Sequence, residues 1–302
     1  MVKLLILLLF LVGGVLLQRF LSAKTLTKLF FYLNRFVIYI SLPAMVLVYL
    51  NNIRFNSSFF IPVVVSWGVF IFSALILYIV AKFLDYSKEM LIAFIMLVSF
   101  TNSSFLGIPF TKVFFGEEGI SYAIIYDQLG SFLILSTFGV IILSLYGIKK
   151  LNIKEIIVKV ITFPSFIALI FTLVFQDINY PSWLFEILKN LSNILAPAAL
   201  VSIGLNLVIK VPKDEFKHMV TALFLKLIAI PLILIAIFRV LDINSLSAKV
   251  SIFESAMAPM VTACMLAIVA NIKPRFVATT LGYGIVLSFI TLPLIYIFFL
   301  KS

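Results

Sequence analysis

Two stretches of the sequence place polar side chains and helix-breaking residues inside apolar runs. The first, at 100–109, contains Asn102, Ser103, Ser104, Gly107 and Pro109. The second, at 253–259, contains Glu254, Ser255 and Pro259. In a bilayer, backbone that leaves the helix is tolerated only where protein buries it or where it lines a cavity. We therefore expect both breaks to lie inside the protein and to form its functional centre.

The ends of the half-helices determine which ligands such breaks could bind. Proline favours the first turn of a helix, where its missing N–H is no loss, so we expect Pro109 and Pro259 to open the second halves of their spans. Half-helix N-termini attract anions, whereas half-helix C-termini and unwound carbonyls suit cations. Where two broken spans cross, sites for an anion and a cation would lie close together.

Ionisable residues within spans are functional candidates by default. Glu254 would coordinate Na⁺, carry a proton or pair with a neighbour. Asp127, followed by Gln128, would line the cavity or cap a helix. Lys226 would reach the cytoplasmic interface or pair with one of these acids. The sequence favours a functional role for Glu254 and a cavity-lining role for Asp127, and it favours neither alternative for Lys226.

Composition sets the class of protein. Of 302 residues, 64% are apolar and 12% are charged, whereas a soluble domain carries roughly 25% charged residues. With a mean hydropathy of +1.24, the chain is predicted to be an all-α integral membrane protein. We interpret the net charge of +11 as lysine and arginine in cytoplasmic loops, with no nucleic-acid partner.

The sequence outside the breaks offers few residues for catalysis or metal binding. The single cysteine, Cys264, lies in an apolar run and cannot form an internal disulfide. The sequence has no His/Cys metal cluster, no P-loop and no nucleophile motif with a base. We therefore expect no enzyme activity, no metal site and no cofactor other than a coupling ion.

Ten stretches are long enough to span a bilayer, which takes about 20 apolar residues. They lie at 3–20, 29–50, 59–84, 90–115, 120–147, 156–175, 188–209, 218–241, 246–271 and 276–300. The first resembles a signal peptide, but Gly13 and Gly14 interrupt its core and no clear cleavage site follows. We interpret it as the first span.

The distribution of basic residues predicts the orientation. With the N-terminus outside, 15 of the 23 lysines and arginines lie in inner loops and 7 on the outer side. Basic residues favour the cytoplasmic side. We therefore expect a multi-pass protein of the cytoplasmic membrane with both termini extracytoplasmic.

The same spans divide into two halves. Pro43 and Pro197 are 154 residues apart, and Pro109 and Pro259 are 150 apart. This register predicts a five-span repeat at 1–147, a cytoplasmic linker at 148–155 and a second repeat at 156–302. Because five is odd, the second copy is inverted, and inverted repeats with broken helices are typical of secondary transporters. The alternative is that each proline only kinks its own helix.

Four motifs resemble those of the auxin efflux carrier family. They are Asn-Ser-Ser-Phe-Leu-Gly-Ile-Pro at 102–109, Tyr-Asp-Gln-Leu-Gly at 126–130, Leu-Ala-Pro-Ala-Ala-Leu at 195–200 and Ala-Met-Ala-Pro at 256–259. The resemblance covers the whole chain, and the motif at 102–109 is the most specific. The short basic loop near 147–155 is similar to the prokaryotic branch.

The resemblance implies ten spans in two inverted repeats, with broken spans four and nine crossing, as in sodium/proton antiporters. It implies a scaffold and a transport part, a small organic anion as substrate, and a dimer as a common assembly. Asn102, Pro109 and Pro259 would be crossover residues, and Glu254 resembles a sodium-coordinating acid of the bile acid symporters. Plant carriers have Asn-Pro-Asn where this chain has Thr-Asn-Ser at 101–103, which argues against an auxin-like substrate.

The function that we predict is secondary active transport of a small carboxylate by alternating access, coupled to Na⁺ or H⁺. The alternative is a channel or a regulated receptor on the same scaffold. The candidate substrate-binding residues are Asn102, Ser103, Ser104, Gly107, Pro109, Gln128 and Pro259. The candidate ion-coupling residues are Asp127, Lys226, Glu254 and Ser255. We expect the neutral first break to bind the anion and the acidic second break to bind the cation.

Overall fold

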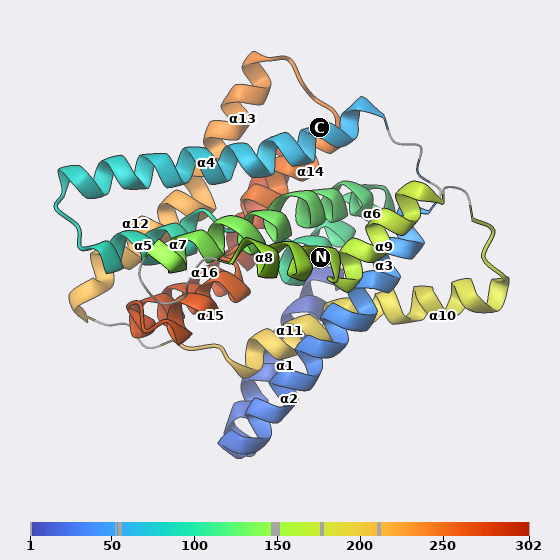
Figure 1. The fold of residues 1–302 in the computed structure, drawn as a ribbon, viewed down its shortest axis with the longest axis horizontal. Coiled ribbons are helices and arrows are strands. Elements are labelled where there is room, and N and C mark those ends of the chain that lie inside the picture. The colour runs from blue at the N-terminus through green and yellow to red at the C-terminus, as the bar shows by residue number, and fades with distance from the viewer. Residues whose placement is uncertain are drawn as a thin grey trace.

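Helices make up every regular element in the described part of the chain (Figure 1). The structure is a computed structural model that describes residues 2–301 except 52, 54–55, 146–151, 176–177 and 210–212. Within those residues, seven helices are long and apolar enough to cross a membrane, or eight if one bent pair is a single span. The predicted all-helical membrane class is thus confirmed.

The first half of the chain begins with long helices and then breaks. Its elements are α1 (Val2–Phe20), α2 (Ala23–Phe36), α3 (Leu42–Leu50), α4 (Phe60–Phe83), α5 (Lys88–Val98), α6 (Ile108–Ile125) and α7 (Val140–Leu145). A π-helical turn, Val37–Ser41, joins α2 to α3, so the second helical segment starts six residues before the predicted span. Ser22 sets that start because its side chain caps the helix.

The α6 helix contains a sharp turn. Gly116 has φ +72° and ψ −163°, a conformation that only glycine adopts readily. The turn separates a first leg, in the predicted span at 90–115, from a second leg, in the predicted span at 120–147. Two π-helical segments, Tyr126–Phe132 and Leu135–Gly139, then lead into α7.

The second half of the chain is more interrupted. Its elements are α8 (Ile153–Ile161), α9 (Pro164–Val174), α10 (Ser182–Asn193), α11 (Leu195–Leu205), α12 (Phe216–Phe224), α13 (Ile230–Val240), α14 (Leu246–Ser255), α15 (Val261–Val269) and α16 (Pro274–Ile295). The predicted span at 156–175 corresponds to α8 and α9, which meet at 61°. Phe163 is extended there because the residue before a proline disfavours the helical conformation. Half of the predicted linker, 148–151, lies outside the described residues.

Packing divides the helices into two groups. In the first, α1 packs against α11, and α3 packs against α9 and α10. Gly14 and Gly204 bring α1 and α11 together so closely that a Cβ atom on either glycine would overlap the other helix. In the second group, α14 packs against α4 and α6, and α15 packs against α5 and α16.

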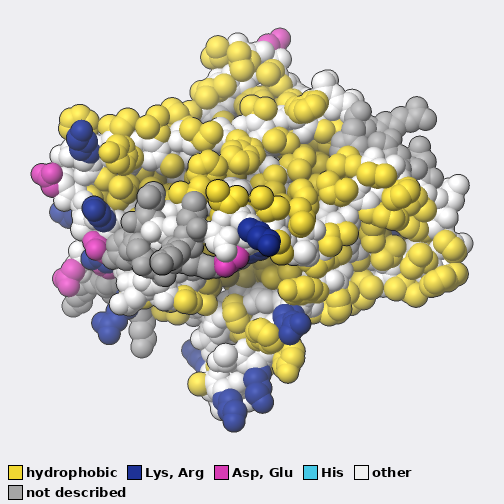
Figure 2. All heavy atoms as spheres, viewed as in Figure 1, with side chains coloured by type: hydrophobic (Ala, Val, Ile, Leu, Met, Phe, Trp, Pro, Cys, Tyr) yellow, Lys and Arg dark blue, Asp and Glu magenta, His cyan; other side chains and the backbone are white. Residues whose placement is uncertain are grey.

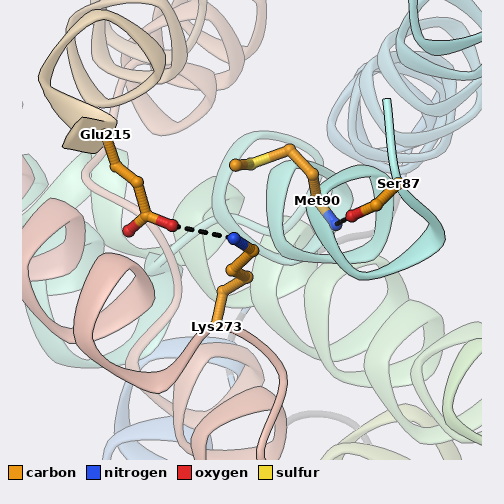
Figure 3. Close-up of polar contacts among 4 residues, drawn as sticks. All are labelled: Ser87, Met90, Glu215 and Lys273. Carbon is orange, nitrogen blue, oxygen red and sulfur yellow. Dashed lines mark hydrogen bonds and ion pairs between the residues drawn. The ribbon is translucent and has the colours of Figure 1, made fainter. Parts of the chain in front are cut away.

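Charged side chains gather away from the broad apolar surface. In Figure 2 hydrophobic side chains cover much of the visible face, and most lysine and arginine side chains lie toward its left and lower margins, although basic and acidic side chains also lie near its centre. Lys273, at the start of α16, forms an ion pair of 3.0 Å with Glu215, and Ser87 caps α5 at Met90 (Figure 3). Such polar contacts suit helix ends at the membrane surface.

Candidate functional site

The two predicted breaks, at 100–109 and 253–259, lie side by side, and we call the place where they meet the crossover. Residues Thr101 and Pro259 pair in a short antiparallel bridge. The Asn102 amide donates to the Ala258 carbonyl at 3.1 Å, and the Met260 amide donates to the Phe100 carbonyl at 3.2 Å. The backbone groups released by the broken helices thus satisfy one another inside the protein.

This bridge corrects the prediction for Pro259. We expected Pro259 to open the second half-helix, but α15 begins at Val261 and Pro259 is extended. Both bridging hydrogen bonds flank Pro259 and neither needs its missing N–H, so proline fits here. Pro109, in contrast, lies in the first turn of α6, as predicted.

The first break holds the side chain of Asp127, from the π-helical segment Tyr126–Phe132. After Asn102 the chain forms a π-helical turn, Ser103–Gly107. Asp127 Oδ1 accepts hydrogen bonds from Ser103 Oγ at 2.6 Å and Ser104 Oγ at 2.5 Å. Its Oδ2 accepts a third, from Gln128 Nε2 at 2.7 Å. Three donors therefore fix the Asp127 carboxylate against the first break.

The second break holds Glu254, at the end of α14. Glu254 Oε1 accepts a hydrogen bond from Thr111 Oγ1, on α6, at 2.8 Å. The carboxylate lies over Gly107, where a Cβ atom would overlap it. Its Oε2 is buried and has no hydrogen-bond partner among the described residues. Ser255 donates to the Ile252 carbonyl of its own helix at 2.6 Å and does not reach the first break through that bond.

Lys226 reaches the crossover from a third helical segment, Phe216–Val240. It lies in the π-helical turn Leu225–Ala229, between α12 and α13. Its side chain is fully buried, and Nζ donates to Thr101 Oγ1 at 2.7 Å. Neither predicted alternative is correct: Lys226 does not reach the interface, and it forms no ion pair with an acid among the described residues.

The site therefore contains two acidic side chains, one beside each break, and one lysine. Our premise of a neutral first break is wrong, because the hydroxyl groups of Ser103 and Ser104 donate to the acidic side chain of Asp127. Buried atoms without a described partner include Asn102 Nδ2, Gln128 Oε1 and Glu254 Oε2. Such atoms are costly to bury, so they mark positions that a ligand or an ion could satisfy.

All predicted site residues lie on or beside the crossover, and all except the half-buried Ser104 are buried. Sequence reasoning missed Thr101 and Thr111, which bond Lys226 and Glu254. Thr101 is adjacent to the motif, and its hydroxyl group was a usable signal. Thr111 looks like an ordinary helical threonine in the sequence.

The chain is similar in sequence to known membrane transport proteins. Residues 3–296 match the family model described as membrane transport protein. An uncharacterized transporter of Methanothermobacter thermautotrophicus is 28% identical over 194 residues, 64% of this chain and 63% of the relative. An uncharacterized transporter of Methanocaldococcus jannaschii is 26% identical over 262 residues, 82% of this chain and 83% of the relative.

Proposed function

The chain belongs to the membrane transport protein family, that of the auxin efflux carriers, and on that premise we propose that it is a secondary active transporter. The proposed substrate is a small organic anion bearing a carboxylate. Transport would follow alternating access, with the crossover as the site that faces each side in turn. The family supports membrane transport in general, and the crossover chemistry supports the anion.

We propose ten spans in two inverted repeats. Helix length alone identifies seven or eight candidate spans among the described residues. The long segment Ser103–Ser144 turns at Gly116, which supports its division between spans four and five. α5 would complete span four, and α14 with α15 would form span nine. Each of these helices is too short to cross a membrane alone, because a break interrupts its span.

The proposed topology places both termini outside the cytoplasmic membrane. Lys82, Lys88, Lys217 and Lys273 would lie on the inner side, consistent with the bias of basic residues toward the cytoplasm. Four further lysines and arginines that entered the prediction, Arg54, Lys149, Lys150 and Lys210, lie outside the described residues. The group that includes α1, α3 and α11 would be the scaffold, and the group that includes α14 and α15 would move.

One observation carries the choice of an anion. Lys226 places a buried ammonium group at the crossover, bonded to the Thr101 hydroxyl and without a carboxylate partner among the described residues. A buried charge without a counterion is costly. Asn102 Nδ2, one residue from Thr101, is a second buried donor without a described partner. Together they would bind a substrate carboxylate.

The two acids are suited to coupling. If Asp127, Glu254 and Lys226 were all ionised, the site would carry one net negative charge. That charge would oppose binding of an anion. A proton or a Na⁺ ion taken up with the substrate would offset that charge. We therefore propose cation-coupled transport, with Glu254 Oε2 as the first position to occupy.

Uptake into proteoliposomes tests this proposal. A panel of mono- and dicarboxylates should show saturable uptake that responds to a pH gradient, a Na⁺ gradient or the membrane potential. A channel on the same scaffold would instead give flux without saturation and single-channel currents. If purified protein moved no carboxylate under any of these gradients, the proposed substrate class would be wrong.

A further inference from the structure

A large apolar groove opens on the outer surface, away from the crossover, between α4 and α13. Its volume is about 470 Å³, within the range of small-molecule sites. The buried side chains Val65, Val69 and Phe238 form its floor, and exposed ones such as Val64 and Ile237 form its rims. Hydrophobic side chains dominate this part of the surface in Figure 2. Both walls belong to candidate membrane spans, so the groove faces lipid.

A second pocket continues this groove at the end of α13. The two share Phe238 and Ile243 as lining residues. The second pocket, of about 220 Å³, is lined by polar groups that include Arg239, Asp242 and Lys249. The apolar groove therefore adjoins a polar pocket that contains basic side chains.

Arg239, which lines the second pocket, packs against an aromatic ring. Its guanidinium carbon lies 5.5 Å from the centroid of the Phe299 ring, in a cation–π contact. Arginine offers a planar set of donors that matches a phosphate group. Arg239 and Lys249 both line the pocket beside Asp242, so a ligand there would meet two basic side chains.

We propose that the groove and its polar pocket form a binding site for one anionic phospholipid of the surrounding bilayer. An acyl chain would lie between α4 and α13, and the headgroup phosphate would bind Arg239. The combined shape favours this occupant, since one amphiphile satisfies both the apolar groove and the basic end. A second copy of the chain would bury the apolar walls but would not account for the basic pocket.

The site has a direct route to the transport machinery. α14 packs against both α4 and α13 and carries Glu254 at its end. A lipid between α4 and α13 would therefore stabilise the two helices that support the second break. The inference rests on the membrane location of the chain and is independent of the proposed substrate.

Gly68 allows a specific test. It lines the groove, and a Cβ atom there would meet nothing within 4 Å. Gly68→Leu should fill the groove without a clash, and it replaces glycine with a better helix former. Gly13, on α1, has the same open surroundings, so Gly13→Leu is the matched control. Arg239→Gln tests the headgroup, with the exposed Arg19→Gln as its control.

The measurement is native mass spectrometry of delipidated, detergent-purified protein titrated with phosphatidylglycerol and, separately, with phosphatidylcholine. We expect one phosphatidylglycerol to bind the wild type, and Gly68→Leu and Arg239→Gln to weaken this binding at least tenfold. The control variants should bind as the wild type does, and phosphatidylcholine should bind more weakly. Equal binding by Gly68→Leu and Gly13→Leu would overturn the site.

Two other results would also overturn the proposal. If Arg239→Gln left the preference for phosphatidylglycerol unchanged, the phosphate would not bind there. If Gly68→Leu converted a dimer to a monomer without changing lipid binding, the occupant would be a second copy of the chain. Thermal unfolding of each variant without lipid establishes that it is folded before binding is compared.

Discussion

At the scale of single residues, the Asp127 carboxylate is the acceptor that organises the first break. Its two oxygens accept all three side-chain hydrogen bonds made by Ser103, Ser104 and Gln128. Because these donors are buried or half-buried, their bonds with Asp127 replace bonds with water. Asp127 thus has a structural role at the first break.

Replacing Asp127 should separate its charge from its role as acceptor. Asp127→Ala leaves three donors without an acceptor, at a cost of about 1–3 kcal/mol for each buried group left unsatisfied. Asp127→Asn keeps an oxygen acceptor and should lose far less stability. The apparent Tm in detergent should therefore fall clearly for Asp127→Ala and little for Asp127→Asn. Equal Tm values for the two variants would contradict the hydrogen-bond assignment.

At the scale of elements, the breaks depend on glycines as much as on prolines. Gly107 leaves space for the Glu254 carboxylate, which any Cβ atom would overlap. Gly107→Ala should displace that carboxylate, lower stability by about 1–3 kcal/mol through overpacking and reduce transport. The shorter acid in the double variant Gly107→Ala/Glu254→Asp should restore part of the stability. Gly68→Ala, which meets nothing, is the control.

The turn in α6 gives a second prediction at this scale. Gly116 adopts a conformation that costs other residues about 1–3 kcal/mol. Gly116→Ala should therefore destabilise the protein by that amount, measured by chemical unfolding in detergent. Gly13→Ala, in a regular helix with open surroundings, should be neutral or stabilising. No difference between the two variants would show that the chain does not turn at Gly116.

The sequence predicted the elements around the site better than it predicted their contacts. The location of both breaks and the first-turn position of Pro109 followed from apolar length and proline chemistry. The extended conformation of Pro259 did not, because it depends on a bridge to Thr101, a distant partner. Likewise, Lys226 and Thr101 are 125 positions apart. Their hydrogen bond arises from tertiary packing, which local patterns do not record.

At the scale of the whole molecule, a polar cluster joins the two groups of helices. Lys112, on the first leg of α6, donates to Tyr49 OH on α3 at 3.1 Å and to Asn193 Oδ1 on α10 at 2.9 Å. In the proposed topology this cluster lies on the extracytoplasmic side. Alternating access would have to break it, so it would hold the outer side closed.

Loss of this cluster should open the outer side. In a Cys264→Ser background, Ser104→Cys provides a thiol beside the crossover. A membrane-impermeant reagent added outside should label this thiol several-fold more in Lys112→Met than without that substitution. The reason is that Lys112→Met removes contacts made in the closed state. Lys3→Met, which removes another outer charge, should leave labelling unchanged. Unchanged labelling in Lys112→Met would contradict the role of the cluster.

The central claim is that Lys226 binds the transported anion at the crossover, and its most direct test is the KM for carboxylate uptake. In proteoliposomes, Lys226→Met should raise KM or lower uptake at least tenfold, a loss of about 1.4 kcal/mol or more in binding. Lys226→Arg, which keeps the charge, should retain part of the activity. Wild-type KM and uptake in a folded Lys226→Met variant would contradict the claim.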